Sequence, residues 1–350
     1  MRATAALKEK KSSRSVKAAV SPPARKLAVA TERKCSIANT VSILSDAWTF
    51  LVIREAFFGA KRFEEFRSGL DISRATLTDR LRRLSHEGIL RETYYSDTSS
   101  RVEYRLTKSG IDLYPAFIAL MQFGDRWLSD GKGGPLQLIH EECNCVSRPI
   151  VACSCCQGQI VADEVSYLDG PGARRMAAET ARRSRRTADD FMRGRPSSVS
   201  RALEIVGDRW SFLILREAFY GAQRFDQLQA ELRIASNILT DRLARLVDRG
   251  IFRKLKYQSQ PERFEYTLTP MGLDLFGPMM MMMAWGDRWR SNGRPPLLLK
   301  HLACGREFTP AVICNKCRKP IHAHAMKYRM RYNPNKFGGT KSGRAIPGRV

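Results

Sequence analysis

The sequence lacks the features on which several common classes of protein depend. No apolar run approaches the roughly 20 residues that a membrane span requires, and residues 1–34 contain no apolar stretch typical of a secretory signal. We find no nucleotide-binding glycine loop, no Ser/His/Asp order, no paired carboxylates on a common predicted face, and only five histidines. These absences predict a cytoplasmic protein that has no membrane partner and is not an enzyme.

Acidic residues are also scarce, at 35 Asp and Glu against 60 Lys and Arg, which gives a net charge of +25. Most of the excess lies in residues 1–34, 170–196 and 327–350, with net charges of +8, +5 and +7. These segments are poor in large apolar residues and are predicted to be a disordered tail, an Arg-rich linker and a second basic tail. Plain solvated linkers are the alternative, but three basic segments favour a polyanionic partner such as nucleic acid.

The chain repeats itself at an offset of 162 residues without a gap over some eighty positions. The offset aligns Asp46-Ala47-Trp48 with Asp208-Arg209-Trp210, Leu77-Thr78-Asp79-Arg80-Leu81 with Leu239-Thr240-Asp241-Arg242-Leu243, and Gly124-Asp125-Arg126-Trp127 with Gly286-Asp287-Arg288-Trp289. A repeat of this length indicates a duplicated domain. We therefore predict one domain over 35–169 and a second over 197–326.

Within one unit, the spacing of apolar residues predicts helices over 37–58, 62–70, 74–86 and 108–129. Two strand-like runs, 89–95 and 101–106, flank a turn-forming loop between the last two helices. This order is the plan of a winged helix-turn-helix, in which the third helix enters a DNA groove and the hairpin touches the flank. The predicted fold class is α+β, mainly α, with two tandem winged helix-turn-helix domains that are each followed by a small Cys/His cap.

The helix over 74–86 has two faces with different predicted roles. Leu77, Leu81 and Leu84 form an apolar stripe that belongs to the core. The opposite face is polar; such a face is usually just solvated, but its position before a wing favours contacts with bases and phosphates. The predicted DNA-binding residues are Ser73, Arg74, Ala75, Thr76, Thr78, Asp79, Arg82, Arg83 and Arg101 in the first unit, and Ser236, Asn237, Thr240, Asp241, Arg245 and Arg263 in the second.

Each unit ends with the pattern His-x2-Cys-x9-Cys-x2-Cys. The predicted metal ligands are His140, Cys143, Cys153 and Cys156 in the first unit, and His301, Cys304, Cys314 and Cys317 in the second. Four such ligands suit a closed, structural zinc site, and no other cofactor is expected. Reduced thiols without metal are the alternative. Cys145 and Cys155 add two thiols to the first unit and leave thiol–disulfide exchange open there.

The sequence resembles the HxlR family of bacterial winged-helix regulators over about 35–157 and 197–325. The residues that carry the resemblance include Ser45-Asp46-Ala47-Trp48, Arg54-Glu55-Ala56-Phe57, Leu77-Thr78-Asp79-Arg80-Leu81, Glu87-Gly88-Ile89-Leu90 and Tyr104-Arg105-Leu106-Thr107, and in the second copy Leu203-Glu204-Ile205-Val206-Gly207-Asp208-Arg209-Trp210. The resemblance implies sequence-specific binding of double-stranded DNA as a dimer, often as a repressor, with dimerisation through the terminal helices.

Two features depart from the family pattern. The family usually has one unit, so the two units here predict either an intramolecular pseudo-dimer or a homodimer through the terminal helices. The cysteine that some members use as a redox sensor is present as Cys35, but the second copy has Ser197. Cys35 is therefore a candidate redox residue, with a small buried hydrophobe as the alternative.

The function predicted from the sequence is a sequence-specific transcription regulator, a repressor that reads DNA with the third helix and the wing of each domain. The alternative is a non-specific nucleoid or RNA-binding protein that uses the basic tails. The two reading helices differ, with Arg74-Ala75-Thr76 in one and Ser236-Asn237-Ile238 in the other. This difference predicts an operator with two unlike half-sites.

Overall fold

The structure is a computed structural model that describes residues 32–33, 35–44, 46–94, 102–129, 131, 133–173, 175–176, 195–333 and 342–344. Most of the predicted tails and of the Arg-rich linker lies outside these ranges, as does the predicted wing residue Arg101. Within the described residues, no helix combines the length and the apolar character that a membrane span would need.

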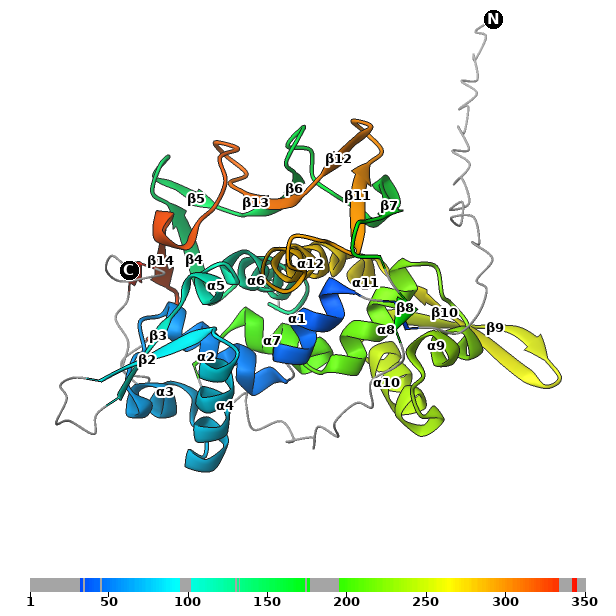
Figure 1. Ribbon diagram of the computed structural model, residues 1–350, viewed down its shortest axis with the longest axis horizontal. Helices are drawn as coiled ribbons and strands as arrows, with labels where there is room; N and C mark the ends of the chain where they lie inside the picture. The colour runs from blue at the N-terminus through cyan, green and yellow to red at the C-terminus, as the bar shows by residue number, and fades with distance from the viewer. Residues whose placement is uncertain are drawn as a thin grey trace, which may run out of the picture.

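Each repeat folds as a winged helix-turn-helix, as the sequence predicts (Figure 1). The first repeat consists of α1 (Ser36–Leu44), α2 (Ala47–Phe57), α3 (Phe63–Leu70), α4 (Arg74–His86), β2 (Leu90–Tyr94), β3 (Val102–Leu106), α5 (Lys108–Ile111) and α6 (Tyr114–Trp127). The second consists of α7 (Ser198–Val206), α8 (Arg209–Phe219), α9 (Phe225–Leu232), α10 (Ser236–Asp248), β9 (Phe252–Ser259), β10 (Glu262–Leu268), α11 (Pro270–Asp274) and α12 (Phe276–Arg290).

Two of the predicted helices are each divided in the structure. The run 37–58 forms α1 and α2 because Asp46 is extended and caps α2, where its carboxylate accepts a hydrogen bond from the Thr49 backbone N–H at 3.2 Å. The run 108–129 forms α5 and α6, and Pro115 stands in the first turn of α6. The helix predicted to read DNA is therefore the fourth helix of its repeat and not the third.

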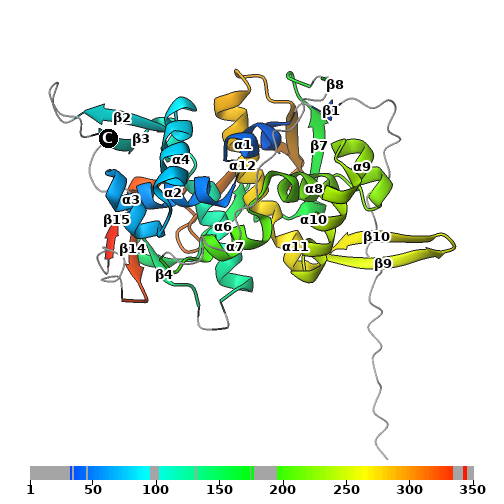
Figure 2. The same cartoon turned by 90° about the horizontal axis from the view of Figure 1, so that it is seen from below.

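The two repeats exchange their first helices. Helix α1 of the first repeat packs on α12 of the second, α7 of the second packs on α6 of the first, and α6 and α12 lie against each other (Figures 1 and 2). Equivalent residues meet at the centre, where the rings of Phe50 and Phe212 stack with centroids 6.1 Å apart and Asp46 forms a β-bridge with Asp208. The repeats therefore share one hydrophobic core.

The repeated Gly-Asp-Arg-Trp motif makes the contact between each terminal helix and the exchanged helix. A Cβ on Gly124 would stand 2.2 Å from the Ser198 carbonyl oxygen, so only glycine allows this close approach. The Ser198 hydroxyl donates to the Asp125 carboxylate beside it. The second copy repeats the arrangement, with the Ser36 hydroxyl donating to Asp287 at 2.5 Å.

A strand-rich arm follows each repeat, over 136–169 and 297–330. The first arm contains β4 (Leu136–His140), β5 (Cys145–Ser147), β6 (Ile150–Cys153) and β7 (Val165–Asp169), and the second contains β11 (Leu297–His301), β12 (Arg306–Phe308), β13 (Pro310–Ile313) and β14 (Met326–Met330). The arms pair with each other, β4 with β14, β7 with β11 and β6 with β13, all antiparallel. Short strands β1 (Glu32–Arg33) and β8 (Arg175–Met176) form another pair, and β15 (Ser342–Arg344) lies beside β14.

The arms and the linker alter two of the predicted segment boundaries. Strand β14 runs across the boundary expected between the second domain and the C-terminal tail at 326, so residues 327–330 belong to the folded part. Arg195, expected in the linker, is buried and forms an ion pair with Glu55 at 3.1 Å. The segment predicted as the C-terminal tail thus begins within β14, which pairs with β4. The segment predicted as the linker ends inside the fold, where Arg195 contacts Glu55.

Replacing Gly124 with Ala tests the close approach of α7 to α6. The added Cβ meets backbone, so α7 must move, and the free energy of unfolding is expected to fall by about 1–3 kcal/mol even though Ala suits a helix better than Gly. Gly277→Ala is the matched control, because its Cβ would meet only the Val151 side chain, at 3.0 Å. Urea denaturation measures both variants, and equal midpoints would contradict the close packing.

Candidate functional site

The helices predicted to read DNA lie on one side of the molecule. Figure 1 shows α4 and α10 on the lower side, at opposite ends of the long axis, with the wings β2–β3 and β9–β10 at the outer ends. The arms lie on the opposite side, above α6 and α12. In this arrangement two helix-plus-wing modules share a face, as they do in dimeric DNA-binding proteins that read two half-sites.

Helix α4 begins at a capped turn. The Ser73 hydroxyl accepts a hydrogen bond from the Thr76 backbone N–H at 3.2 Å, which fixes the start of the helix. Arg74 bonds to Glu64 at 2.5 Å on the exposed surface, and an exposed pair of this kind contributes little stability and can exchange partners. The exposed members of the predicted set in this helix are Ser73, Arg74, Ala75, Thr78, Asp79 and Arg82, whereas Thr76 is half-buried.

Helix α10 presents the corresponding face with different chemistry. Ala235 stands at its N-cap, so no side chain caps this helix, in contrast to α4. Ser236, Asn237, Thr240 and Asp241 are exposed. Asn237 offers both a donor and an acceptor where α4 has Ala75, so the two reading faces differ at equivalent positions.

Several arginines of the reading helices bind the protein itself. Arg80 bonds to the α2 cap Asp46, and Arg242 to the α8 cap Asp208, each at 3.0 Å. Arg83 donates to the Ser42 carbonyl and Arg245 to the Glu204 carbonyl, near the ends of α1 and α7.

These half-buried contacts place Arg83 and Arg245 as braces between the reading helix and the first helix. Their guanidinium groups satisfy carbonyls that α1 and α7 leave without a helical partner. Both residues therefore have partners inside the protein, and their predicted contact with DNA stays a prediction.

The second wing carries exposed cations in addition to the predicted residue Arg263. Arg263 is exposed as predicted, and Arg253, Lys254 and Lys256 on the neighbouring strand β9 are exposed too. Lys254 lies over the Phe264 ring, with Nζ 3.9 Å from its centroid. The run 253–256 could have signalled this surface, because three cations in four residues of a predicted wing are suited to phosphate contacts.

The eight predicted metal ligands gather into two clusters, but not in the predicted grouping. The first, here called the His140 site, contains His140, Cys143, Cys314 and Cys317; the second, the His301 site, contains Cys153, Cys156, His301 and Cys304. In each site the ligand atoms all lie within 4.8 Å of one another and could hold a metal ion. The prediction of one site inside each repeat is therefore wrong, because the pairing of the arms brings ligands of both repeats together.

The donor set of each cluster fits a borderline to soft divalent metal. Three sulfurs and one imidazole nitrogen are the ligands of many structural zinc sites. Burial raises the pKa of Cys314, but hydrogen bonds from the Ser147 hydroxyl and the backbone N–H groups of Cys317 and Lys316 outweigh it and lower that pKa to about 6. A backbone hydrogen bond from Arg306 lowers the pKa of Cys304 to about 7. Cys314 in the His140 site and Cys304 in the His301 site therefore lose their protons more readily than an ordinary cysteine, and the thiolate is the form that binds metal.

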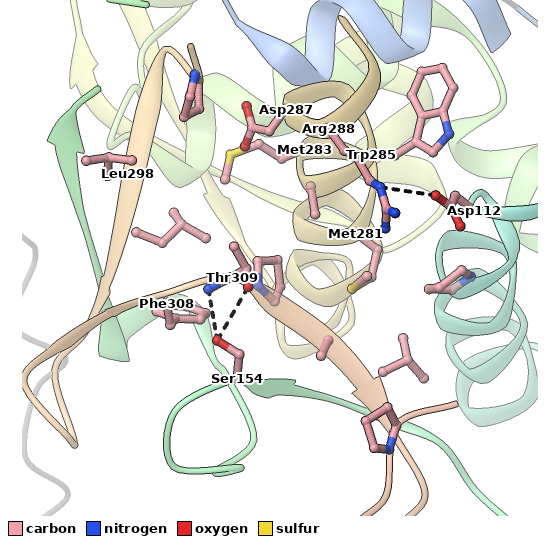
Figure 3. Close-up of a pocket in the computed structure, with 18 of the residues that line it drawn as sticks. Asp112, Ser154, Met281, Met283, Trp285, Asp287, Arg288, Leu298, Phe308 and Thr309 are labelled. Atoms are coloured by element: carbon pink, nitrogen blue, oxygen red, sulfur yellow. Dashed lines mark hydrogen bonds and ion pairs between the residues drawn. The ribbon is translucent and has the colours of Figure 1, made fainter. Parts of the chain in front are cut away.

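A cavity of about 830 Å³ lies between α12 and the second arm (Figure 3). Its apolar walls include Met281, Met283 and Phe308, and Asp287 and Arg288 add charge. Burial raises the pKa of Asp287 to about 6, against the opposing effect of its hydrogen bond from Ser36. Arg288 bonds to Asp112 at 3.3 Å. These charged groups facing the cavity are therefore already engaged within the protein.

Cys35, the candidate redox residue, is buried with 4% of its surface exposed at the start of α1. In the second repeat, the Ser197 hydroxyl caps α7 at the equivalent position. The burial matches the alternative of a small core residue, and the redox role of Cys35 stays a prediction.

Known proteins resemble each repeat. The family model described as HxlR-like helix-turn-helix matches residues 43–132 and 205–294. The chain is similar to three proteins that are each named as an uncharacterized HTH-type transcriptional regulator. That of Mycobacterium tuberculosis is 48% identical over 128 residues, 36% of this chain and 80% of the relative. That of Synechocystis is 39% identical over 95 residues (27% and 70%), and that of Bacillus subtilis is 32% identical over 90 residues (25% and 71%).

Substituting the neighbours Arg82 and Arg83 separates a surface residue from a brace. Arg83→Ala removes the bond to the Ser42 carbonyl, so we expect the free energy of unfolding to fall by about 1 kcal/mol. Arg82→Ala, at an exposed position, should change it by less than about 0.5 kcal/mol. Thermal unfolding of both variants measures the difference, and equal stabilities would show that Arg83 is not a brace.

Proposed function

Because the chain belongs to the HxlR-like helix-turn-helix family, whose curated relatives are transcriptional regulators and not enzymes, we propose that it is a sequence-specific DNA-binding repressor. Helices α4 and α10 would enter successive major grooves, and the wings would contact the flanking backbone. The observation that supports this most is the placement of both reading faces on one side of the molecule (Figure 1). The protein would act in the cytoplasm, where it occupies its site on the chromosome.

We further propose that the two repeats of one chain take the place of two subunits. The exchange of α1 and α7 and the contact between α6 and α12 support this assignment. A chain that pairs its own repeats presents two reading helices without a second copy. Because these helices differ in sequence, they are expected to bind two different half-sites and not a palindromic DNA sequence.

An asymmetric operator is the expected outcome when binding sites are selected from random DNA with the full chain. Arg74→Ala should relax the base preference in one half-site and Asn237→Ala in the other, each by about 1–3 kcal/mol if the side chain makes a bidentate contact with a base. Quantitative binding to single-base variants of the selected site measures both effects.

Two results would contradict the proposal. A perfect palindrome, with both substitutions weakening both halves equally, would show that the readers are equivalent. Specific binding less than about 10³-fold tighter than binding to random DNA would instead favour a non-specific nucleoid or RNA-binding protein that uses the basic segments.

We also propose that both clusters bind zinc and that the ions are structural. The three-sulfur, one-nitrogen donor sets support this, since a site with four protein ligands leaves no open position for a substrate. When bound, zinc would replace the thiol protons and fix the arms. In this role the ion contributes to the stability of the fold rather than to a reaction.

Metal analysis of the purified full chain should find close to two zinc ions per molecule. Replacing Cys314 and Cys317 with Ser should remove one of them and lower the midpoint of thermal unfolding, because two of four ligands of the His140 site are lost. Cys145→Ser and Cys155→Ser, outside both clusters, are the controls. A chelated protein that is free of metal and as stable as before would contradict a structural role.

A further inference from the structure

We propose that each zinc ion is bound between the two repeats, so that the pair of ions clips the first arm to the second. This inference rests on the proposed zinc and identifies which residues share an ion. The first arm gives His140 and Cys143 to one site and Cys153 and Cys156 to the other, and the second arm supplies the complementary halves. Neither repeat could complete a site alone in this arrangement.

Three of the distances between ligand atoms in the His140 site match those of a tetrahedral zinc site. With Zn–S near 2.3 Å and Zn–N near 2.0–2.1 Å, sulfurs should lie about 3.8 Å apart and sulfur and nitrogen about 3.5 Å apart. The Cys143 and Cys314 sulfurs are 3.9 Å apart. The His140 Nδ1 atom lies 3.5 Å from the Cys143 sulfur and 3.3 Å from the Cys317 sulfur.

The His301 site repeats these distances with the roles of the arms reversed. The Cys153 and Cys304 sulfurs are 3.9 Å apart, and the Cys156 sulfur lies 3.3 Å from Nδ1 of His301. Glu164 of the first arm faces the other side of the ring, 3.7 Å from Nε2. Both sites thus share the same sulfur–sulfur distance and closely similar sulfur–nitrogen distances.

The backbone around the sulfurs is shaped as metal-binding turns are. The N–H of Cys155 donates to the Cys153 sulfur at 3.3 Å, and the N–H of Gly158 to the Cys156 sulfur at 3.4 Å. In the second arm, the N–H of Lys316 donates to the Cys314 sulfur at 3.4 Å. Such donors stabilise negative charge on sulfur, and they orient each Cys-x2-Cys pair toward the His and Cys of the other arm.

The strand pairing explains why the ligands meet across the repeats. Strand β4 ends at His140 and pairs with β14, and β11 ends at His301 and pairs with β7. Between the sites, β6 and β13 form a ladder of four residue pairs, with Cys153 at one end and Cys314 directly after the other. An isolated two-stranded ladder is marginal in water at best, and an ion near each end would hold it.

Two variants of identical composition distinguish sharing between repeats from binding within each repeat. Each changes one His to Asn and three Cys to Ser in the full chain. The same-site variant alters His140, Cys143, Cys314 and Cys317, and the same-repeat variant alters His140, Cys143, Cys153 and Cys156. Sharing between repeats predicts one zinc in the same-site variant and none in the same-repeat variant, because the latter removes half of each site.

Zinc content is measured after dialysis by colorimetric release, with circular dichroism to confirm that the helices are retained. In the same-site variant, the remaining ion should protect Cys153, Cys156 and Cys304 from alkylation, mapped by mass spectrometry. The reverse stoichiometry, none in the same-site variant and one in the same-repeat variant, would overturn the inference while leaving the zinc proposal intact. A wild-type chain without zinc would overturn both, and operator binding, measured separately, decides the regulator proposal.

Discussion

The exchange of the first helices between repeats is the contact on which the rest of the structure depends. It places α1 against α12 and α7 against α6, and it requires glycine at two helix positions where backbone meets backbone. Because the exchanged helices also accept hydrogen bonds from Arg83 and Arg245, the same contact fixes the position of α4 and α10. Displacing an exchanged helix would therefore disturb both the core and the side of the molecule that carries α4 and α10.

The two copies keep the same residues at several of the points where they meet, and they differ at the exposed starts of α4 and α10. Asp125 and Asp287 accept equivalent serine hydroxyls, and Phe50 stacks on its own counterpart Phe212. The exposed starts of α4 and α10 share neither their caps nor their charges. The chemistry of the interface constrains both copies in the same way, while an exposed position can change at little cost in stability.

The sequence predicted the local structure of each repeat, because hydrophobic spacing and capping residues act over a few positions. It also identified the eight residues that gather into the two Cys/His clusters. The predicted apolar stripe of Leu77, Leu81 and Leu84 is buried in the structure. The sequence could not predict which copy of a pattern partners which. A duplicated chain offers each strand and each Cys-x2-Cys pair two chemically equivalent partners, and only the three-dimensional path of the arms selects between them.

Other differences have similarly local causes. The division of the first predicted helix depends on Asp46 adopting an extended conformation, which hydrophobic spacing does not register. Arg82 and Arg83 are neighbours in sequence but point to different sides of α4. Arg82 is exposed, whereas Arg83 reaches the Ser42 carbonyl of α1, whose position the sequence does not reveal. The run 253–256 shows the positive charge of the second wing in the sequence itself. That these side chains are exposed is seen only in the structure, where β9 and β10 form the wing.

The exchanged helices also determine when the chain can fold during its synthesis. Helix α1 ends at Leu44, whereas α12, on which it packs, begins only at Phe276. At ordinary ribosomal speeds of about 5–20 residues per second, the delay between them is on the order of ten to fifty seconds. During this time the face of α1 that packs on α12 lacks that partner, and exposed apolar surface of this kind makes a nascent chain prone to aggregate. Only completion of the second repeat closes the shared core.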